Sequence, residues 1–149
     1  MKRDIRIKWF FPHPVEEVWE CLTNPELVNT WLMKNDFRPV VGHHFQFHAR
    51  PLPKMGWDGI VYCEVLELKP NERLVYSWKG GPRPGVITLD TLLTWTLAPV
   101  QGDTEMILEH TGFKGMKNML SSIFMERGWK KGITRRFENV LKERGYEQA

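Results

Sequence analysis

The strongest constraint on the fold of this chain is a change of hydrophobic period along its sequence. Near the N-terminus, Ile5 and Ile7 alternate with Arg6 and Lys8, and a period of two is typical of a half-buried strand. Further on, the apolar residues between Trp129 and Leu141 recur every three or four positions, which is typical of an amphipathic helix. The sequence therefore predicts an α+β fold, a sheet followed by a long C-terminal helix.

Strand patterns cover most of the chain before residue 112. Short turns at Pro70-Asn71 and Gln101-Gly102-Asp103 separate consecutive strands, and strands joined by short turns pair antiparallel. Apolar residues of the segment 57–68 fall on both faces, so we expect a β-bulge or burial on both sides there. The predicted strands of this curved sheet of about six to seven strands lie at 5–9, 45–47, 57–68, 74–78, 86–97 and 104–111.

Two short helices are expected directly after the first strand. Pro14 suits the first turn of a helix, where its missing N–H costs nothing, and the apolar residues from Val15 to Leu22 have helical spacing. Asn24 is a suitable N-cap for a second helix, with Pro25 at its first position.

A curved sheet with one apolar face needs a cover, and the C-terminal helix is the only predicted element large enough. One helix does not fill a strongly curved sheet, so we expect a pocket between the two. The helix is expected to end near Gly145, and residues 115–128 form either its first turns or a separate helix. Residues 1–149 are predicted to be one domain, because two cores of ordinary size would not fit.

Charge and cysteine content argue against several classes of protein. The net charge is only +3 without a long basic run, so no nucleic-acid partner is predicted. No stretch is apolar enough for a membrane span, and the N-terminus lacks the apolar segment of a signal peptide. Cys21 and Cys63 are predicted to be unpaired residues of a reducing compartment, which indicates a cytoplasmic location.

No cofactor or metal is predicted. Phosphate-loop, dinucleotide-binding, zinc-protease and serine-hydrolase motifs do not occur in the sequence. The nearest group of metal-ligating residues is His43, His44 and His48. On a strand, His43 points away from the other two, so three ligands do not converge.

The aromatic residues supply candidates for a pocket wall. Seven Trp and eight Phe are more than a core of this size usually uses, and methionine adapts to irregular apolar ligands. For each of these residues, packed core is the alternative interpretation. The predicted ligand-binding residues are Trp31, Met33, Trp57, Trp78, Trp95, His110, Phe113, Met125, Trp129 and Ile133.

His110 allows two interpretations. It follows Met106 and Leu108 on one face of a strand, so its imidazole is expected to point toward the cavity, where it could orient a ligand or shuttle a proton. Alternatively, it is a core-edge histidine bonded to a backbone carbonyl. The sequence places no carboxylate or hydroxyl beside it, so no catalytic residues are predicted.

Several short segments together resemble a known family. The chain resembles the START-like or SRPBCC superfamily, which has the birch-pollen-allergen fold, and within it the branch named for the C-terminal domain of the activator of the ninety-kilodalton heat-shock protein ATPase. The resemblance implies a helix-grip fold with a cavity for an apolar ligand and implies no particular activity. The matching segments are 14–19, 24–27 with Trp31, Gly42 with Phe45, 57–59, 70–74 with Trp78, 94–97, Thr104, 110–113 and 128–129.

Three functional interpretations follow. The leading one is a non-enzymatic module that holds a hydrophobic small molecule, a lipid or an aromatic metabolite, in a cavity between sheet and C-terminal helix. The second is a cyclase- or hydrolase-type enzyme with His110 as acid and base. The third is a stress-related, co-chaperone-like domain that binds a protein partner. Polar residues on the outward face of the strands argue against the third: Arg6, Lys8, His44, Gln46, Thr94 and Thr96.

Overall fold

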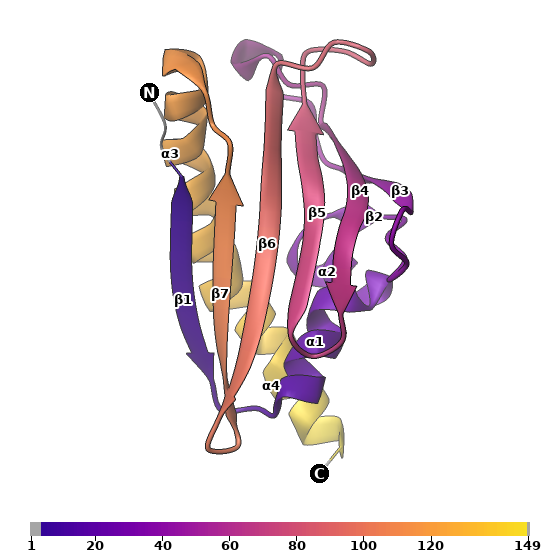
Figure 1. The fold of residues 1–149 in the computed structure, drawn as a ribbon, viewed down its shortest axis with the longest axis vertical. Coiled ribbons are helices and arrows are strands. Elements are labelled where there is room, and N and C mark those ends of the chain that lie inside the picture. The colour runs from indigo at the N-terminus through magenta and orange to yellow at the C-terminus, as the bar shows by residue number, and fades with distance from the viewer. Residues whose placement is uncertain (1–3, 149) are drawn as a thin grey trace.

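The computed structural model of the protein describes residues 4–148. It contains one seven-stranded antiparallel sheet with the strand order β1-β7-β6-β5-β4-β3-β2 (Figure 1). The strands are β1 (Ile5–Phe11), β2 (Lys34–Asn35), β3 (His44–His48), β4 (Ile60–Lys69), β5 (Arg73–Gly80), β6 (Leu89–Val100) and β7 (Asp103–Thr111). The predicted fold class, a curved antiparallel sheet around a C-terminal helix, is confirmed.

The helices all lie on one side of this sheet (Figure 1). The two short helices predicted after the first strand are α1 (Val15–Thr23) and α2 (Pro25–Trp31), and a 3₁₀ turn, η1 (Pro53–Met55), lies in the loop before β4. The C-terminal helix runs without a break through α3 (Gly115–Gly132), a π-helical segment η2 (Ile133–Phe137) and α4 (Glu138–Gln148). Residues 115–128 therefore begin the long helix, which ends at Gln148 and not near Gly145.

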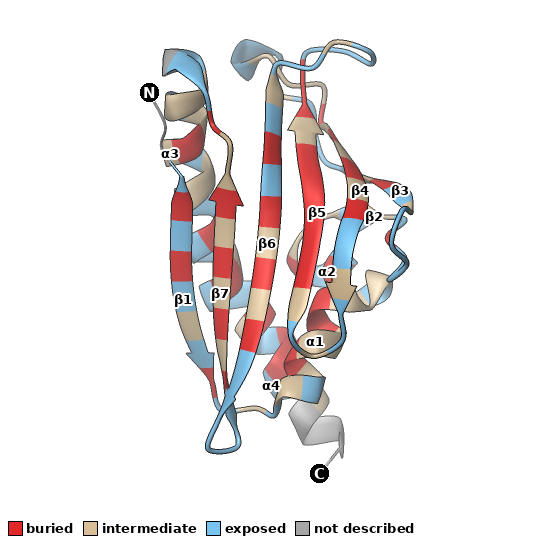
Figure 2. Cartoon of the chain, in the orientation of Figure 1, coloured by how far each residue is buried: buried red, intermediate tan, exposed pale blue. Residues whose placement is uncertain are grey.

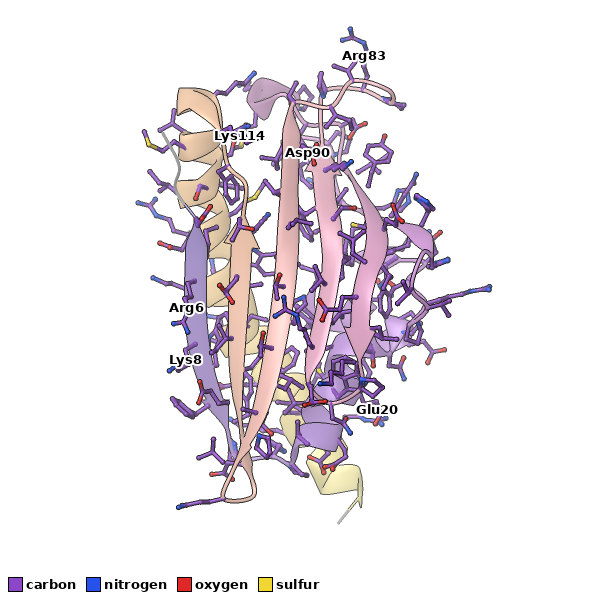
Figure 3. All side chains as sticks on the ribbon, in the orientation of Figure 1. Arg6, Lys8, Glu20, Arg83, Asp90 and Lys114 are labelled. Atoms are coloured by element: carbon purple, nitrogen blue, oxygen red, sulfur yellow. The ribbon has the colours of Figure 1, made fainter. Side chains whose placement is uncertain are left out.

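Burial alternates along the strands as the sequence predicts (Figure 2). Ile5 and Ile7 on β1 are buried, whereas Arg6 and Lys8 extend into solvent (Figure 3). The register of β4 against β5 shifts between Val65 and Glu67, which confirms the expected bulge. The two-residue strand β2 was not predicted, because two residues are too few to show a period.

The π-helical segment η2 explains how the apolar stripe of the long helix stays on one side. Trp129, Ile133 and Phe137 are all buried and follow one another at intervals of four residues. An α-helix has about 3.6 residues per turn, so residues four apart drift steadily around it. The wider turn of a π-helix absorbs this drift, and both Ile133 and Phe137 then face the sheet.

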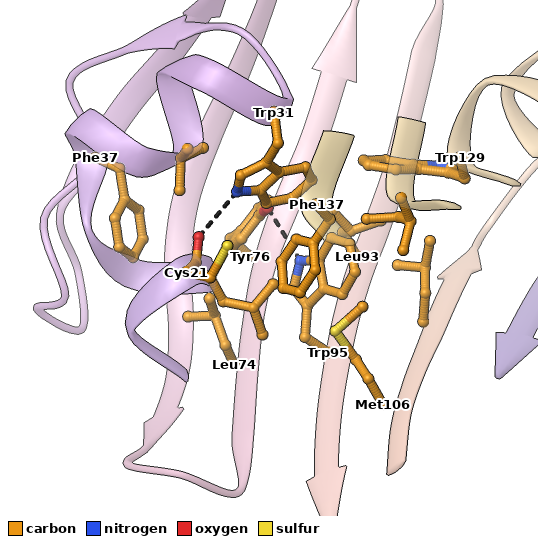
Figure 4. Packing of buried hydrophobic residues seen from close by; sticks show 14 of the residues in the cluster. Cys21, Trp31, Phe37, Leu74, Tyr76, Leu93, Trp95, Met106, Trp129 and Phe137 are labelled. Carbon is orange, nitrogen blue, oxygen red and sulfur yellow. Dashed lines mark hydrogen bonds between the residues drawn. The ribbon is translucent and has the colours of Figure 1, made fainter. Parts of the chain in front are cut away.

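The short helices close one end of the space between sheet and helix. The Asn24 side chain caps α2 by accepting a hydrogen bond from the Glu26 N–H at 3.0 Å. Trp31, at the end of α2, donates its indole N–H to the Cys21 carbonyl at 2.9 Å, which ties α2 to α1 (Figure 4). Helix α1 contacts α4 and β6, and α2 contacts η2.

Candidate functional site

A pocket of about 250 Å³ lies at the opposite end, where α3 begins. Its walls come from three places: α3 between Lys117 and Trp129, the loop around η1, and the end of β5 with the start of β6. The residues just after α2 lie behind them. Most of its lining is apolar. The lining residues are Leu32, Met33, Leu52, Met55, Gly56, Trp57, Val61, Trp78, Lys79, Gly80, Gly81, Thr88, Leu89, Lys117, Asn118, Ser121, Phe124, Met125, Gly128 and Trp129.

The loop around η1 forms a small closed turn that presents Trp57 to the pocket. Leu52 and Trp57 pair with each other through two backbone hydrogen bonds, at 2.9 and 3.2 Å. Gly56 has φ +68° and ends η1 in a left-handed conformation, which favours glycine. The Trp57 indole N–H donates to the Ile60 carbonyl at 2.9 Å, so the ring is held against the start of β4.

The loop after β5 is equally tight. A Cβ at Gly81 would lie 1.8 Å from the Val86 carbonyl oxygen, so only glycine allows the backbone of the loop to fold back this closely. The Gly81 carbonyl also accepts a hydrogen bond from the Asp58 N–H at 2.9 Å. This hydrogen bond joins the loop before β4 to the loop after β5 at the mouth of the pocket.

A chain of hydrogen bonds behind the pocket fixes Trp129. The Trp129 indole N–H donates to His110 Nδ1 at 3.2 Å. His110 Nε2 lies 2.8 Å from Thr91 Oγ1, and the Thr91 hydroxyl donates to the Trp78 carbonyl at 2.7 Å. Since Nδ1 accepts and the Thr91 proton is used elsewhere, the imidazole is neutral with its proton on Nε2.

Burial also favours this neutral form of His110. The side chain is fully buried, and the loss of hydration lowers its pKa to about 3. Its ring contacts Phe113, Trp78 and Trp129, at centroid distances of 4.6, 5.6 and 6.2 Å. His110 is therefore a structural support for the pocket wall, covered by Trp78 and Trp129, and it does not reach the pocket.

The indole N–H of Trp78, in the apolar wall of the pocket, has no hydrogen-bond partner among the described residues. Trp78 is 5% exposed and lines the pocket, and none of the hydrogen bonds among residues 4–148 uses its Nε1. In this part of the chain every buried side-chain nitrogen or oxygen has a partner, so this N–H reaches accessible space. A ligand oxygen in the pocket could accept it.

The structure divides the predicted ligand-binding residues into two groups. Five of them line the pocket: Met33, Trp57, Trp78, Met125 and Trp129. The other five are buried, at 2% exposure or less, and do not line it: Trp31, Trp95, His110, Phe113 and Ile133. The second group is buried in the protein interior. A ligand-binding role stays a prediction for all ten residues.

Sequence reasoning missed other parts of the wall. Leu52 and Met55 lie in a segment predicted only as a loop, although apolar residues between prolines and glycines are a usable signal. Lys117 and Ser121 share a helix face with the predicted residue Met125 at four-residue spacing, but the sequence did not show which side of the helix faces the sheet. Thr91 was missed because its place beside His110 depends on the register of β6 against β7.

The described residues contain neither a cluster of metal ligands nor a helix suited to crossing a membrane. Between residues 4 and 148, no three His, Cys, Asp or Glu residues come close enough to hold a metal ion. His43 donates its Nε2–H to the Asp36 carbonyl at 2.9 Å, and His44 and His48 are exposed. None of the helices within these residues is long and apolar enough to cross a membrane.

Comparison with known families matches residues 12–142 to the family described as Activator of Hsp90 ATPase homolog 1-like protein. The chain belongs to this family. The match covers most of the sheet and most of the long helix, and it confirms the resemblance found in the sequence. A comparison with curated proteins gives no match.

Solved structures of bacterial proteins share the fold of this family member. Protein MLL2253 from Mesorhizobium loti is 33% identical with a TM-score of 0.82, over 95% of this chain and 98% of that one. Protein BH1534 from Bacillus halodurans is 24% identical with a TM-score of 0.72, over 95% and 99% of the two chains. CalU16 from Micromonospora echinospora is 22% identical with a TM-score of 0.67, over 97% and 84%. The last two likenesses show the fold alone.

Proposed function

We propose that the protein is a non-enzymatic binding module that holds a small apolar molecule in the pocket between the sheet, α3 and the η1 loop. The observation that carries this proposal is the composition of the wall. Three indoles, Trp57, Trp78 and Trp129, and two flexible thioethers, Met33 and Met125, line one pocket. Ligand sites are typically concave and mostly apolar, with few polar groups.

The volume of the pocket limits the size of the ligand. An apolar cavity of about 150 Å³ is enough for benzene, so a pocket of about 250 Å³ suits a molecule of about ten to twelve non-hydrogen atoms. Aromatic metabolites and medium-length alkyl chains have this size. A whole membrane lipid would extend well outside the pocket.

The buried His110 argues against the enzymatic alternative. A general acid or base must come within hydrogen-bond reach of the substrate, directly or through one water. Both ring nitrogens of His110 are already engaged by Thr91 and Trp129, and its side chain has no exposed surface. With a pKa near 3, it would also be a weak base at neutral pH.

Titration with toluene and 1-octanol, followed by calorimetry and by tryptophan fluorescence, tests the binding proposal. We expect both probes to bind with affinities tighter than about 1 mM and to change the fluorescence of the pocket indoles. Met125→Trp should fill the pocket and weaken 1-octanol binding at least about tenfold, because the added ring takes the ligand's place.

The matched control is Leu120→Trp, which adds the same ring to the same helix at a position that is 63% exposed and outside the pocket wall. It should bind 1-octanol like the unmodified protein. Absence of binding by both probes, or equal binding by both variants, would contradict the proposal. The single-domain organisation of residues 1–149 and the cytoplasmic location stay predictions.

A further inference from the structure

One lysine side chain crosses the mouth of the pocket. Lys117 belongs to the first turns of α3, and its Nζ lies 3.7 Å from the position that a Cβ would occupy at Gly56 in the η1 loop. Both residues line the pocket, on opposite walls. The ammonium group is therefore located at the edge of an otherwise apolar space.

No carboxylate of the described residues neutralises this ammonium. The described wall of the pocket contains no Asp or Glu, and the ion pairs found within residues 4–148 do not include Lys117. The nearby Asp58 uses its carboxylate elsewhere, as acceptor for the Ile60 N–H at 3.0 Å and for the Tyr62 hydroxyl at 3.3 Å.

The second lysine of the wall is arranged differently. Side chains alternate along a strand, so Lys79 faces outward when its neighbour Trp78 faces the core. Its Nζ lies 3.8 Å from the Asp90 carboxylate on β6, and Figure 3 shows Asp90 near the start of that strand. The charge of Lys79 is therefore balanced by Asp90 on the other face of the sheet.

Two other polar side chains at the mouth, those of Asn118 and Ser121, already have partners. The Asn118 amide donates to the Thr88 carbonyl at 3.2 Å, and the Ser121 hydroxyl donates to the Lys117 carbonyl at 3.3 Å. These contacts leave the Lys117 ammonium as a charged donor at the mouth that is available to a ligand.

We propose that the pocket takes an amphipathic carboxylate, with its apolar body among the indoles and its carboxylate beside Lys117. This inference rests on the proposed binding function. A charged group is costly to bury without a partner, so the carboxylate stays at the mouth, where water and the ammonium both reach it. One lysine suits a single small anion better than a phosphate group, which usually receives several charge-assisted hydrogen bonds.

The test compares octanoate with 1-octanol, two probes of similar length that differ in charge, in the full chain at low salt. Replacing Lys117 by Gln should weaken octanoate binding about fivefold, because a charge-assisted contact at a partly exposed site is lost. The affinity for 1-octanol should change less than twofold. Lys117→Arg keeps the charge and should keep at least half of the octanoate affinity.

The matched control is Lys131→Gln, which removes one positive charge from an exposed position of the same helix outside the pocket. It should leave the ratio of octanoate to 1-octanol affinity unchanged within twofold. If both probes bind and Lys117→Gln leaves this ratio unchanged, the carboxylate proposal is overturned while the binding function stands. If neither probe binds, both proposals fail.

Discussion

The two ends of the space between sheet and long helix use the same kinds of residue with opposite results. At the end closed by α1 and α2, Trp31, Trp95 and Phe137 are at most 2% exposed and pack edge to face or tilted at 5.0–5.8 Å (Figure 4). At the end where α3 begins, Trp57 and Trp78 border an open pocket.

The difference lies in how many elements cover the curved sheet. At the closed end, α1 and α2 lie beside the long helix and contact η2, α4 and β6, so three helices share the apolar face. At the open end, α3 is the only one of the described helices that lies across the sheet, and the η1 loop and the residues just after α2 complete the cover. Aromatic content therefore does not by itself make a pocket, because the number of covering elements decides whether the rings pack or remain accessible.

Trp129 marks the border between the two ends. Its ring packs against Trp95 of the closed end at 5.6 Å and against Trp78 of the pocket at 5.3 Å. The hydrogen bond to His110 holds the indole in one orientation. The shape of the pocket thus depends on residues of the core behind it.

The largest expected effect contrasts two phenylalanines of the same long helix. Phe137→Ala should lower the free energy of unfolding by about 3–5 kcal/mol, because it leaves a cavity beside Phe11 and Trp31 at the closed end. Phe124→Ala, at a residue that is 54% exposed beside the pocket, should cost less than about 1 kcal/mol. Urea denaturation measures both, and equal losses would remove the distinction between the two ends.

The next expected effect is a pH dependence of stability that comes from His110, which holds Trp129 at the border between the two ends. The folded-state pKa of His110 is about 3, below its value of about 6.5 in the unfolded chain. Below pH 6.5 the unfolded chain therefore binds a proton that the folded protein does not. The contribution of the neutral His110 imidazole to the free energy of unfolding is complete above pH 6.5 and falls as the pH drops toward 3. The expected loss between pH 7 and pH 5 is about 2 kcal/mol.

His110→Gln can keep both hydrogen bonds without titrating, so this loss should be absent from its unfolding curves. His48→Gln, at an exposed histidine of β3, controls for the removal of a histidine elsewhere. Urea denaturation at several pH values measures the difference between each variant and the unmodified protein. A pH dependence of His110→Gln that equals that of the unmodified protein would contradict the buried, neutral state of the imidazole.

The smallest expected effect concerns Gly128 at the open end, where a glycine leaves space for a ligand but lowers the stability of the helix. Gly128 lines the pocket within α3, and a Cβ there would meet nothing within 4 Å. Gly128→Ala should raise the free energy of unfolding by about 0.5–1 kcal/mol, because glycine is a poor helix former. Thermal or urea unfolding measures this gain.

Gly132 provides the comparison, since a Cβ there also has open space but the residue does not line the pocket. Gly132→Ala should stabilise similarly. Gly128→Leu should weaken 1-octanol binding several-fold, whereas Gly132→Leu should leave it unchanged. Equal effects of the two leucine variants would show that Gly128 does not determine the size of the ligand.

Local patterns were sufficient to predict most of the fold. The alternation at Ile5 and Ile7, the cap at Asn24 and the stripe from Trp129 to Leu141 each depend on residues close in sequence, and each predicted its element correctly. Errors occurred where geometry is not local. The strand predicted from residue 86 begins at Leu89, and the one predicted from residue 57 begins at Ile60, because both segments start in loops that form the pocket mouth.

The sequence did not predict which aromatic residues border the pocket. Trp78 and Trp95 both lie on strands with alternating apolar residues, and only Trp78 borders the pocket. His110 was correctly expected to face inward. Its burial behind Trp78 and Trp129 could not be foreseen, because these three residues meet only through strand register and the position of the helix.

What the sequence by itself determined is the order of strands and helices and the inward face of each, since both follow from side-chain periodicity. Only the tertiary structure decided where packing is incomplete. Incomplete packing depends on how strongly the sheet curls and on how many elements lie across it. Both are set by contacts between residues that are distant in sequence. Contacts between distant residues also bring Lys117 close to Gly56 at the mouth of the pocket. These two residues are about sixty positions apart in the sequence.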